Sequence, residues 1–151
     1  MPTHMIEPAA ATPDRFLREG RRLPFFEAVK SGLSVGVPGL LRMLEMAHRA
    51  HGKLAWERLF QPALRLARDG FEVSPRLNFL LTWAARPEHF APAARAYFYD
   101  GEGNPLPVGH RLRNPEFADT LASIAVDGAA AFYAGPIAEA IVEAVQNAPR
   151  H

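Results

Sequence analysis

Prolines at the starts of helical patterns constrain this chain more than any other feature of its sequence. Three of its 14 prolines directly follow Ser74, Asn114 and Gly135, and each opens a segment with helical periodicity. Proline is tolerated in the first turn of a helix, because its missing N–H would have no partner there and its φ is already helical. Serine and asparagine are also favoured N-caps. These pairs predict separate helices rather than disorder or a large sheet.

The apolar residues behind these prolines indicate where the helices should lie. After Pro38, the residues Leu40, Leu41, Leu44 and Ala47 recur at the spacing of one buried helix face. Similar spacing recurs behind the later prolines. We therefore expect helices near residues 38–50, 55–69, 75–85, 115–127 and 136–147.

Other segments are expected to depart from this pattern. Pro62 lies inside the second predicted helix, and we expect it to break or bend that segment into two helices at a corner. The aromatic residues 97–99, a glycine-rich turn and a further apolar stretch predict one small β-hairpin near 96–112. Residues 1–34 show no clean period. We expect an extended N-terminal arm over 1–34 and a helical lobe over 35–151.

Composition supports a mainly α fold and excludes several classes of function. The chain has 151 residues, about the length of one domain, and no cysteine, so disulfides and thiolate metal sites are excluded. Alanine is abundant while valine and isoleucine are scarce, which favours helices over strands. The net charge of +1 creates no strong field for nucleic acid or an acidic membrane. The longest uncharged stretches are shorter than the ~20 residues of a membrane span, and no export leader is visible.

One short segment matches a catalytic motif. Residues 32–36 fit the Gly-x-Ser-x-Gly nucleophile elbow of serine hydrolases, with Ser34 as the nucleophile and Asp69, His89 and His110 downstream as nominal partners. A nucleophile elbow requires a strand before the serine, a helix directly after it and a parallel sheet that carries the other groups. Because the sequence predicts only one hairpin, a glycine-flanked approach to the next helix explains the match better.

Histidines offer a second set of candidates. His48 and His51 are spaced i and i+3 near the end of a predicted helix, so both imidazoles could reach one metal ion, but no third ligand accompanies them. A helix C-terminus favours positively charged side chains, and we expect these histidines to stabilise the helix end or to be solvated. His89 and His110 have no carboxylate at helical spacing, so neither is assigned as a general base.

A basic cluster lies in the N-terminal arm. Its members are Arg15, Arg18, Arg21 and Arg22. Guanidinium groups bind carboxylates and phosphates through two parallel hydrogen bonds. Exposed arginines spaced like this more often pair with nearby acids, here Asp14 and Glu19, and we expect a solvated surface cluster rather than an anion site. The glycine clusters of the chain do not fit phosphate-binding spacings, so no nucleotide site is predicted.

Many short motifs along the chain match one known protein family in order and spacing. The first are AAATPDRF (9–16), SVGVPG (34–39), HGKL (51–54), Trp56, PA (62–63), LARDGF (66–71) and VSPR (73–76). The later ones are LRNP (112–115), Leu121, Gly128, FY (132–133), GPIA (135–138) and Ile141. Together they resemble the large subunit of the gamma-glutamyltransferases, also called glutathione hydrolases. The resemblance extends from about Pro8 to Asn147 and corresponds to a middle section of that subunit.

The resemblance implies a helical lobe of a larger αββα Ntn-hydrolase, made as a precursor that cuts itself into a large and a small subunit. In this family the new N-terminal threonine of the small subunit is the nucleophile, and its free amine can act as the base. The resulting γ-glutamyl ester passes its acyl group to water or an amino acid. The resemblance implies no metal or organic cofactor.

The family's functional residues lie almost entirely outside this chain. The catalytic threonine and the oxyanion-hole glycines belong to the small subunit, and nothing here matches them. An arginine of an Arg-Glu-Thr-Ala-Pro-type stretch grips the substrate's α-carboxylate in the family, and in register with Pro8 that position is His4. A histidine lacks the forked, permanently charged guanidinium. We therefore assign no catalytic, substrate-binding or metal residue to this chain.

The resemblance implies that this chain is a structural segment of a gamma-glutamyltransferase, inactive by itself. Its expected partners are the rest of the large subunit and the small subunit. We expect a large exposed hydrophobic surface and self-association of the isolated segment. No nucleic acid or membrane partner is expected, and the resemblance implies a periplasmic or extracellular parent enzyme. Two alternatives stay open: a free-standing helical module that binds a peptide or protein, and a small serine hydrolase that acts through Ser34.

Overall fold

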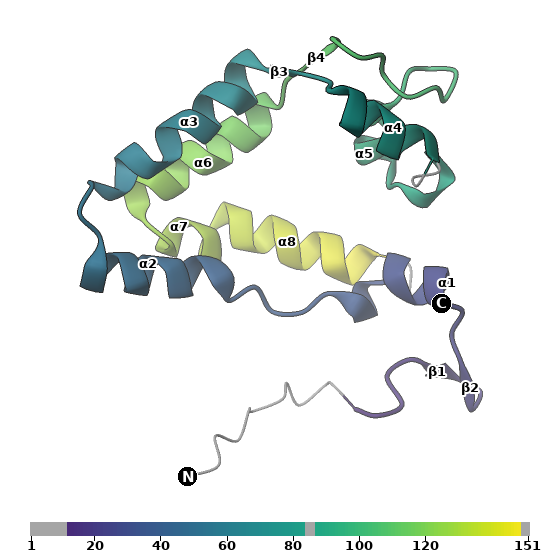
Figure 1. Ribbon diagram of the computed structural model, residues 1–151. Coiled ribbons are helices and arrows are strands. Elements are labelled where there is room, and N and C mark those ends of the chain that lie inside the picture. Colours follow the sequence, from purple (N-terminus) through teal and green to yellow (C-terminus); the bar gives the residue numbers. More distant parts are fainter. Residues whose placement is uncertain (1–11, 84–86, 149–151) are drawn as a thin grey trace. The chain divides into compact units, whose positions relative to one another are not determined.

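The computed structural model describes residues 12–83 and 87–148. These residues are mostly helical, with two short antiparallel strand pairs, so the expectation of a mainly α fold is confirmed. In chain order the elements are β1 (Leu17–Arg18), β2 (Arg21–Arg22), α1 (Phe25–Lys30), the 3₁₀ helix η1 (Gly32–Ser34), α2 (Leu40–His51), α3 (Trp56–Asp69), β3 (Phe71–Glu72), α4 (Pro75–Trp83), the 3₁₀ helix η2 (Pro87–His89), α5 (Pro92–Phe98), β4 (Arg111–Leu112), α6 (Pro115–Asp127), α7 (Ala130–Tyr133) and α8 (Pro136–Asn147) (Figure 1).

The chain divides into two compact units. The larger runs from Pro38 to Ala140, and the smaller comprises the residues up to Val37 together with those from Ile141 onward. This division differs from the expected arm over 1–34 and lobe over 35–151, because the later turns of α8 group with the N-terminal residues.

The larger unit is built on α3 and α6, which lie side by side and antiparallel (Figure 1). At one end of the pair, the indole N–H of Trp56 donates to the carbonyl of Ile124 (3.0 Å). At the other end, the N–H of Asn114 donates to the carbonyl of Ala67 (2.8 Å). Ala67 and Ala118 are buried. Small side chains at a contact let two helix axes approach closely, so these alanines are suited to this packing.

The capped helix starts are confirmed at α4 and α6. The N–H of Leu77 donates to Ser74 Oγ (3.1 Å), and the N–H of Phe117 donates to Asn114 Oδ1 (2.9 Å). Each bond satisfies one of the N–H groups that have no intrahelical partner at a helix start. The caps therefore fix where these two helices begin.

Helix α3 continues through Pro62, so the expectation of two helices at a corner is wrong. A proline inside a helix removes the hydrogen bond to the carbonyl four residues earlier, which here belongs to Arg58. Pro62 and Arg58 are both exposed, so water can satisfy that carbonyl. The contacts with α6 at both ends of α3 then hold one helix through the proline.

Strands β3 and β4 close a long excursion of the chain between α3 and α6. Phe71 pairs with Leu112 in antiparallel register. The excursion carries α4 and α5, and Leu81 and Tyr99 are buried within it. The hydroxyl of Tyr99 donates to the carbonyl of Leu81 (3.0 Å), which ties the end of α5 to α4.

This arrangement differs from the single hairpin expected near 96–112. Residues 97 and 98 are the last of α5, and one isolated bridge joins Tyr99 to Pro105. The strand Arg111–Leu112 pairs with β3 rather than with residues 97–99. Pro92 opens α5 and alanines follow it, and this combination favours helix strongly enough to include the aromatic residues.

Helix α2 does not bury the apolar face expected from its sequence. Leu40 and Leu44 are 65% and 47% exposed, whereas Glu45 is only 5% exposed. The carboxylate of Glu45 accepts the backbone N–H of Ala129, immediately before α7 (3.0 Å). A polar contact therefore holds α2 in the larger unit, and much of its leucine face lies open.

The smaller unit is more structured than the extended arm expected over residues 1–34. Strands β1 and β2 form a hairpin that turns at Glu19 and Gly20, and α1 and η1 follow it. Gly32 lies so close to the carbonyl of Val145 in α8 that a Cβ at this position would overlap it. The 3₁₀ helix η1 therefore lies against the C-terminal part of α8.

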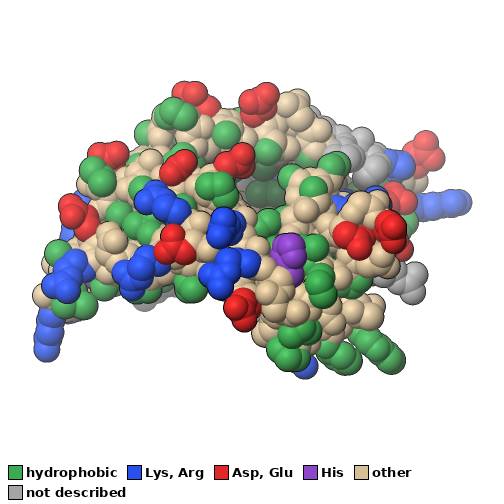
Figure 2. Space-filling view, turned by 90° about the horizontal axis from the view of Figure 1, so that it is seen from above, with side chains coloured by type: hydrophobic (Ala, Val, Ile, Leu, Met, Phe, Trp, Pro, Cys, Tyr) green, Lys and Arg blue, Asp and Glu red, His purple; other side chains and the backbone are tan. Residues whose placement is uncertain are grey.

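Hydrophobic side chains reach the surface at many places in the described part of the chain. Trp83 is 79% exposed and Val126 is 73% exposed. Figure 2 shows hydrophobic side chains lying between charged ones across one face. Large apolar groups left open in this way are typical of surfaces that another chain segment covers. None of the described helices is both long and apolar enough to cross a membrane.

Candidate functional site

Ser34, the candidate nucleophile, lies at the end of a 3₁₀ turn. Its hydroxyl is positioned to donate to the carbonyls of Val29 (3.0 Å) and Ser31 (2.9 Å). The preceding element is α1, so no strand leads into the serine. A nucleophile elbow needs the hydroxyl exposed on a strand-to-helix turn. The structure therefore gives Ser34 the role of closing its own turn.

The nominal partners of Ser34 belong to the other unit and form no catalytic pair in the described part of the chain. Asp69 ends α3, and its carbonyl accepts from Arg113 Nε (3.2 Å). His110 is exposed before β4, and its carbonyl accepts the N–H of Val73 (2.8 Å). His89 ends η2, and its side chain lies outside the described part. His4 also lies outside the described residues.

His48 and His51 do not meet at a metal. The ring of His48 packs 5.2 Å from that of Trp56, and its Nε2 is hydrogen-bonded to the carbonyl of Leu54 (2.9 Å). His51 is exposed at the end of α2. Among the described residues, no group of three His, Asp or Glu side chains could hold a metal ion. His48 therefore acts structurally, because it fixes the turn between α2 and α3.

Arg18, Arg21 and Arg22 of the arginine cluster lie on the β1–β2 hairpin. Arg18 and Arg21 are directly opposite each other across the two strands, and both are exposed. Within residues 12–83 and 87–148, no ion pair joins either arginine to Asp14 or Glu19. Arg15 instead donates through Nε to the carbonyl of Leu33 (2.8 Å). The prediction of local ion pairing was wrong for Arg18 and Arg21.

A buried carboxylate forms the strongest electrostatic feature that the sequence reasoning missed. Glu45 Oε1 accepts from Ala129 N–H (3.0 Å) and Arg49 Nη2 (3.2 Å), and Oε2 accepts from Arg42 Nη1 (3.1 Å). The hydrogen bond from Ala129 and the two guanidinium groups lower the pKa of Glu45 below its ordinary value of 4.5, against the opposing effect of burial. Arg42 also lies 5.1 Å from the centre of the Tyr133 ring.

The signal for this network was present in the sequence. Arg42, Glu45 and Arg49 have the i, i+3 and i+4 spacing at which helix side chains meet. Spacing alone predicts two exposed ion pairs that share Glu45. It does not predict that the carboxylate is buried. That burial depends on the N–H of Ala129, which comes from a segment far along the chain.

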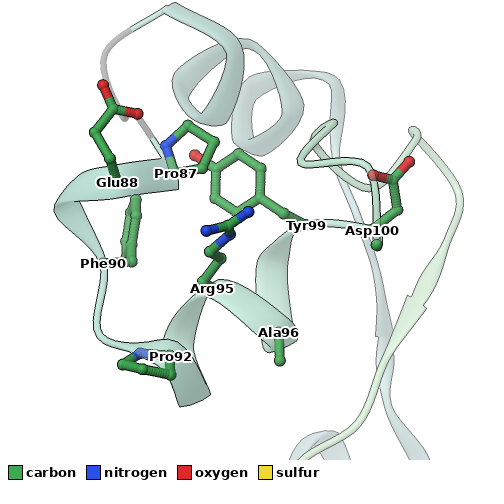
Figure 3. A pocket seen from close by; sticks show the side chains of 9 residues that line it. Pro87, Glu88, Phe90, Pro92, Arg95, Ala96, Tyr99 and Asp100 are labelled. Carbon is green, nitrogen blue, oxygen red and sulfur yellow. The ribbon is translucent and has the colours of Figure 1, made fainter.

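A cavity of about 480 Å³ lies in the excursion between β3 and β4. Its lining includes Phe90, Arg95, Tyr99 and Asp100. Figure 3 shows the Arg95 side chain rising from α5 in front of the Tyr99 ring. Burial, followed by the charge of Glu88, raises the pKa of Tyr99 above its ordinary value of 10.0. The cavity combines aromatic surface with one guanidinium and the carboxylates of Glu88 and Asp100, and no serine, threonine or histidine is among its described lining residues.

The turn beside this cavity is held by one aspartate. Asp100 Oδ1 accepts the N–H groups of Glu102 (3.0 Å) and Asn104 (2.8 Å), and Oδ2 accepts from Asn104 Nδ2 (3.2 Å). These bonds, led by that from the Asn104 backbone, hold the pKa of Asp100 below its ordinary value of 3.8. Asp100 is thus occupied by its own turn and has little capacity to bind or move a proton.

Comparison with known proteins gives this arrangement its context. A protein-family model described as gamma-glutamyltranspeptidase matches residues 5–149. The glutathione hydrolase proenzyme of Arthroderma benhamiae is 38% identical over 143 residues, which are 93% of this chain and 24% of that protein. The glutathione hydrolase proenzyme of Bacillus subtilis is 36% identical over 141 residues, with the same two coverages. This chain therefore spans about a quarter of the length of these relatives.

A solved structure agrees in fold. The crystal structure of Helicobacter pylori gamma-glutamyltranspeptidase superposes on this chain with a TM-score of 0.80 at 29% identity. The match covers 90% of this chain and 39% of the Helicobacter pylori chain. The fold of this chain thus matches one section of that longer chain.

Proposed function

Because the chain belongs to the gamma-glutamyltranspeptidase family, we propose that it is a supporting section of the large subunit of a gamma-glutamyltransferase and performs no chemistry alone. The parent enzyme cleaves γ-glutamyl amides such as glutathione and transfers the acyl group to water or an amino acid. Its nucleophile is the threonine that begins the small subunit. The partners of this section are the remainder of the large subunit and the small subunit.

One observation carries this proposal. The family match extends over nearly the whole chain, from residue 5 to residue 149, yet the chain spans only 24% of the Arthroderma benhamiae relative. The described residues agree with a supporting role: Ser34 closes its own turn, and His48 fixes a loop. The exposed leucine face of α2 is what a section covered by other parts of an enzyme would present. No finding favours a free-standing binding module.

The first experiment assays the purified chain with a γ-glutamyl anilide. We expect no release of the aniline above the rate without protein, while the full-length Bacillus subtilis relative serves as a positive control. Turnover by the chain that is lost on Ser34→Ala would overturn the proposal, because it would place a working nucleophile in this section.

The second experiment reads the DNA on both sides of the coding segment. We expect an open reading frame that continues without interruption into a small subunit beginning with threonine. Native start and stop signals at the two ends would instead support a free-standing module. The same reading tests the proposed periplasmic or extracellular location of the parent, because an export leader would be encoded upstream.

A further inference from the structure

We propose that a second cavity, beside β4, binds a small phosphate monoester, and that Arg111 and Arg113 hold its phosphate group. The cavity has a volume of about 500 Å³, within the range of about 300–1,000 Å³ typical of sites for small molecules. The proposed γ-glutamyl nucleophile belongs to another subunit, so this site is additional to that chemistry.

Gly70, which follows α3, allows the two arginine side chains to lie close together. The point that a Cβ of residue 70 would occupy is 2.8 Å from Arg111 Cγ and 2.8 Å from Arg113 Cγ. These two Cγ atoms are therefore at most twice that distance apart. Leu112 is buried while both arginines are exposed, as expected where successive side chains of an extended segment point to opposite faces. The two arginines thus extend from the same face.

The lining of this cavity is positively charged. Arg111 and Arg113 line it together with His110, and no aspartate or glutamate is among its described lining residues. Arg113 Nε donates to the carbonyl of Asp69 (3.2 Å), which is a neutral acceptor. No ion pair joins Arg113 to an acid within residues 12–83 and 87–148. The contact with Asp69 therefore positions this guanidinium without cancelling its charge.

Glu72 is the acid that competes with a ligand for Arg111. Arg111 Nη2 lies 3.4 Å from Glu72 Oε1, and the two side chains are 52% and 66% exposed. Exposed ion pairs of this kind contribute little free energy, so a dianion can displace the glutamate. Two arginines against this one paired glutamate also leave a net positive charge. Glu72 therefore weakens anion binding but does not prevent it.

A phosphate monoester fits this cavity better than a monocarboxylate. Above its second pKa of about 6 it carries two negative charges and three free oxygens, enough to accept from both guanidinium groups. A monocarboxylate has one charge and two oxygens, which one arginine satisfies. Burial raises the pKa of Tyr97 above its ordinary value of 10.0, so this lining residue keeps its phenolic proton as a further donor. The Tyr97 ring and Leu106 offer apolar surface to the organic part of the ester.

Equilibrium dialysis of the 151-residue chain with phenyl phosphate at pH 8 and low ionic strength tests this inference. We expect saturable binding with a Kd on the order of 1 mM, as is typical for so small a ligand. Phenyl sulfate has the same shape but one negative charge, and it should bind about tenfold more weakly. Inorganic phosphate lacks the ring and should bind about threefold more weakly than phenyl phosphate.

Three results would overturn the proposal. The first is no saturable binding of phenyl phosphate up to about 20 mM. The second is equal binding of phenyl phosphate and phenyl sulfate, because the two arginines would then not select a dianion. The third is inorganic phosphate that binds as tightly as the ester, because the apolar wall would then contribute nothing.

Variants then locate the site. Arg113→Gln should weaken phenyl phosphate binding about tenfold, whereas Glu72→Gln should tighten it about threefold, because Arg111 loses its competing partner. Arg58→Gln, which removes an exposed charge near the other end of α3, should change nothing. Circular dichroism shows whether each variant is folded. If Arg113→Gln does not fold, Glu72→Gln and the phosphate–sulfate comparison still decide. Equal losses in the Arg113 and Arg58 variants, or no tightening in Glu72→Gln, would refute a site held by both arginines.

Discussion

At the scale of single residues, Glu45 shows how one buried carboxylate links segments that are distant in sequence. It receives hydrogen bonds from the Ala129 backbone and from Arg42 and Arg49, so its charged form is favoured in the folded chain. A group whose pKa is lowered by folding contributes stability above its unfolded pKa, and this contribution is lost as the pH falls through the folded value. For Glu45 the loss begins near pH 4.5 and continues below it.

Glu45→Gln should therefore lower the melting temperature at pH 7 by several degrees and reduce its dependence on pH between 5 and 3. Protonation of Asp100 at low pH also destabilises the folded chain. Because Asp100 is present in both proteins, its contribution cancels when their melting temperatures are compared. Glu143→Gln is the control, because this exposed glutamate of α8 makes no ion pair in the described part of the chain. Parallel pH profiles for the unmodified chain and Glu45→Gln would contradict the role given to Glu45.

Two glycines with nearly the same positive φ allow a matched test of packing. Gly70 and Gly109 have φ of 89° and 86°. A Cβ at Gly70 would lie 2.6 Å from the Leu112 carbonyl oxygen, whereas a Cβ at Gly109 would meet nothing within 4 Å. Gly109→Ala should lower the free energy of unfolding by only about 1–2 kcal/mol, because alanine disfavours a positive φ. Gly70→Ala should cost about 1–3 kcal/mol more, because β4 must also move.

Urea unfolding of both variants measures the difference. Equal losses of stability would show that β3 and β4 do not lie as close to α3 as described.

The sequence predicted residue roles well where the partner is local and poorly where it is distant. The caps at Ser74 and Asn114 follow from neighbouring residues, and both are present. The burial of Glu45 depends on Ala129, which lies far along the chain. This contact cannot be derived from spacing along one helix.

At the scale of elements, proline has opposite effects at two positions. Pro115 occupies the first turn of α6, where it removes no hydrogen bond. Pro62 lies inside α3 and removes one. Pro62→Ala should therefore stabilise the chain by about 1–3 kcal/mol, while Pro115→Ala should change stability by less than about 1 kcal/mol. Differential scanning calorimetry of both variants checks this, and a destabilising Pro62→Ala would show that the proline fits a bend that the packing requires.

The strand pairs show the limit of sequence patterns for elements. Aromatic residues before a glycine turn predicted a hairpin, but α5 extends to Phe98 because its proline start and alanines favour helix. Strand β4 pairs with β3, which precedes it by two helices. Two-residue strands carry too little periodicity to reveal such a partner. Helices with ten or more residues, by contrast, carry enough.

At the scale of the whole molecule, the chain leaves exposed the surface that a longer protein would cover. Leu40 and Leu44 belong to the face of α2 that the sequence predicted to be buried, and both are exposed. This exposure agrees with the proposal that other parts of a longer protein cover α2. The family resemblance led us to expect an exposed hydrophobic surface, whereas periodicity alone predicted that these leucines are buried.

The isolated chain should therefore self-associate, and the combined change Leu40→Gln and Leu44→Gln should shift it toward monomer without loss of helix content. Light scattering after size-exclusion chromatography measures the mass, and circular dichroism the helix content. Thr120→Gln in α6 is a control for a polar change outside this face. The idea fails if the chain is monomeric at high concentration, or if the double variant associates as strongly as the unmodified chain.

The short ladder of β3 and β4 has a consequence for how this section can vary. Phe71 pairs with Leu112, and the N–H of Val73 donates to the carbonyl of His110. Residues 74–108 therefore leave the α3–α6 pair and return to it at the same strand pair. We expect insertions or deletions within residues 74–108 to leave this strand pairing unchanged. The segment could then vary in length and sequence while α3 and α6 keep their packing.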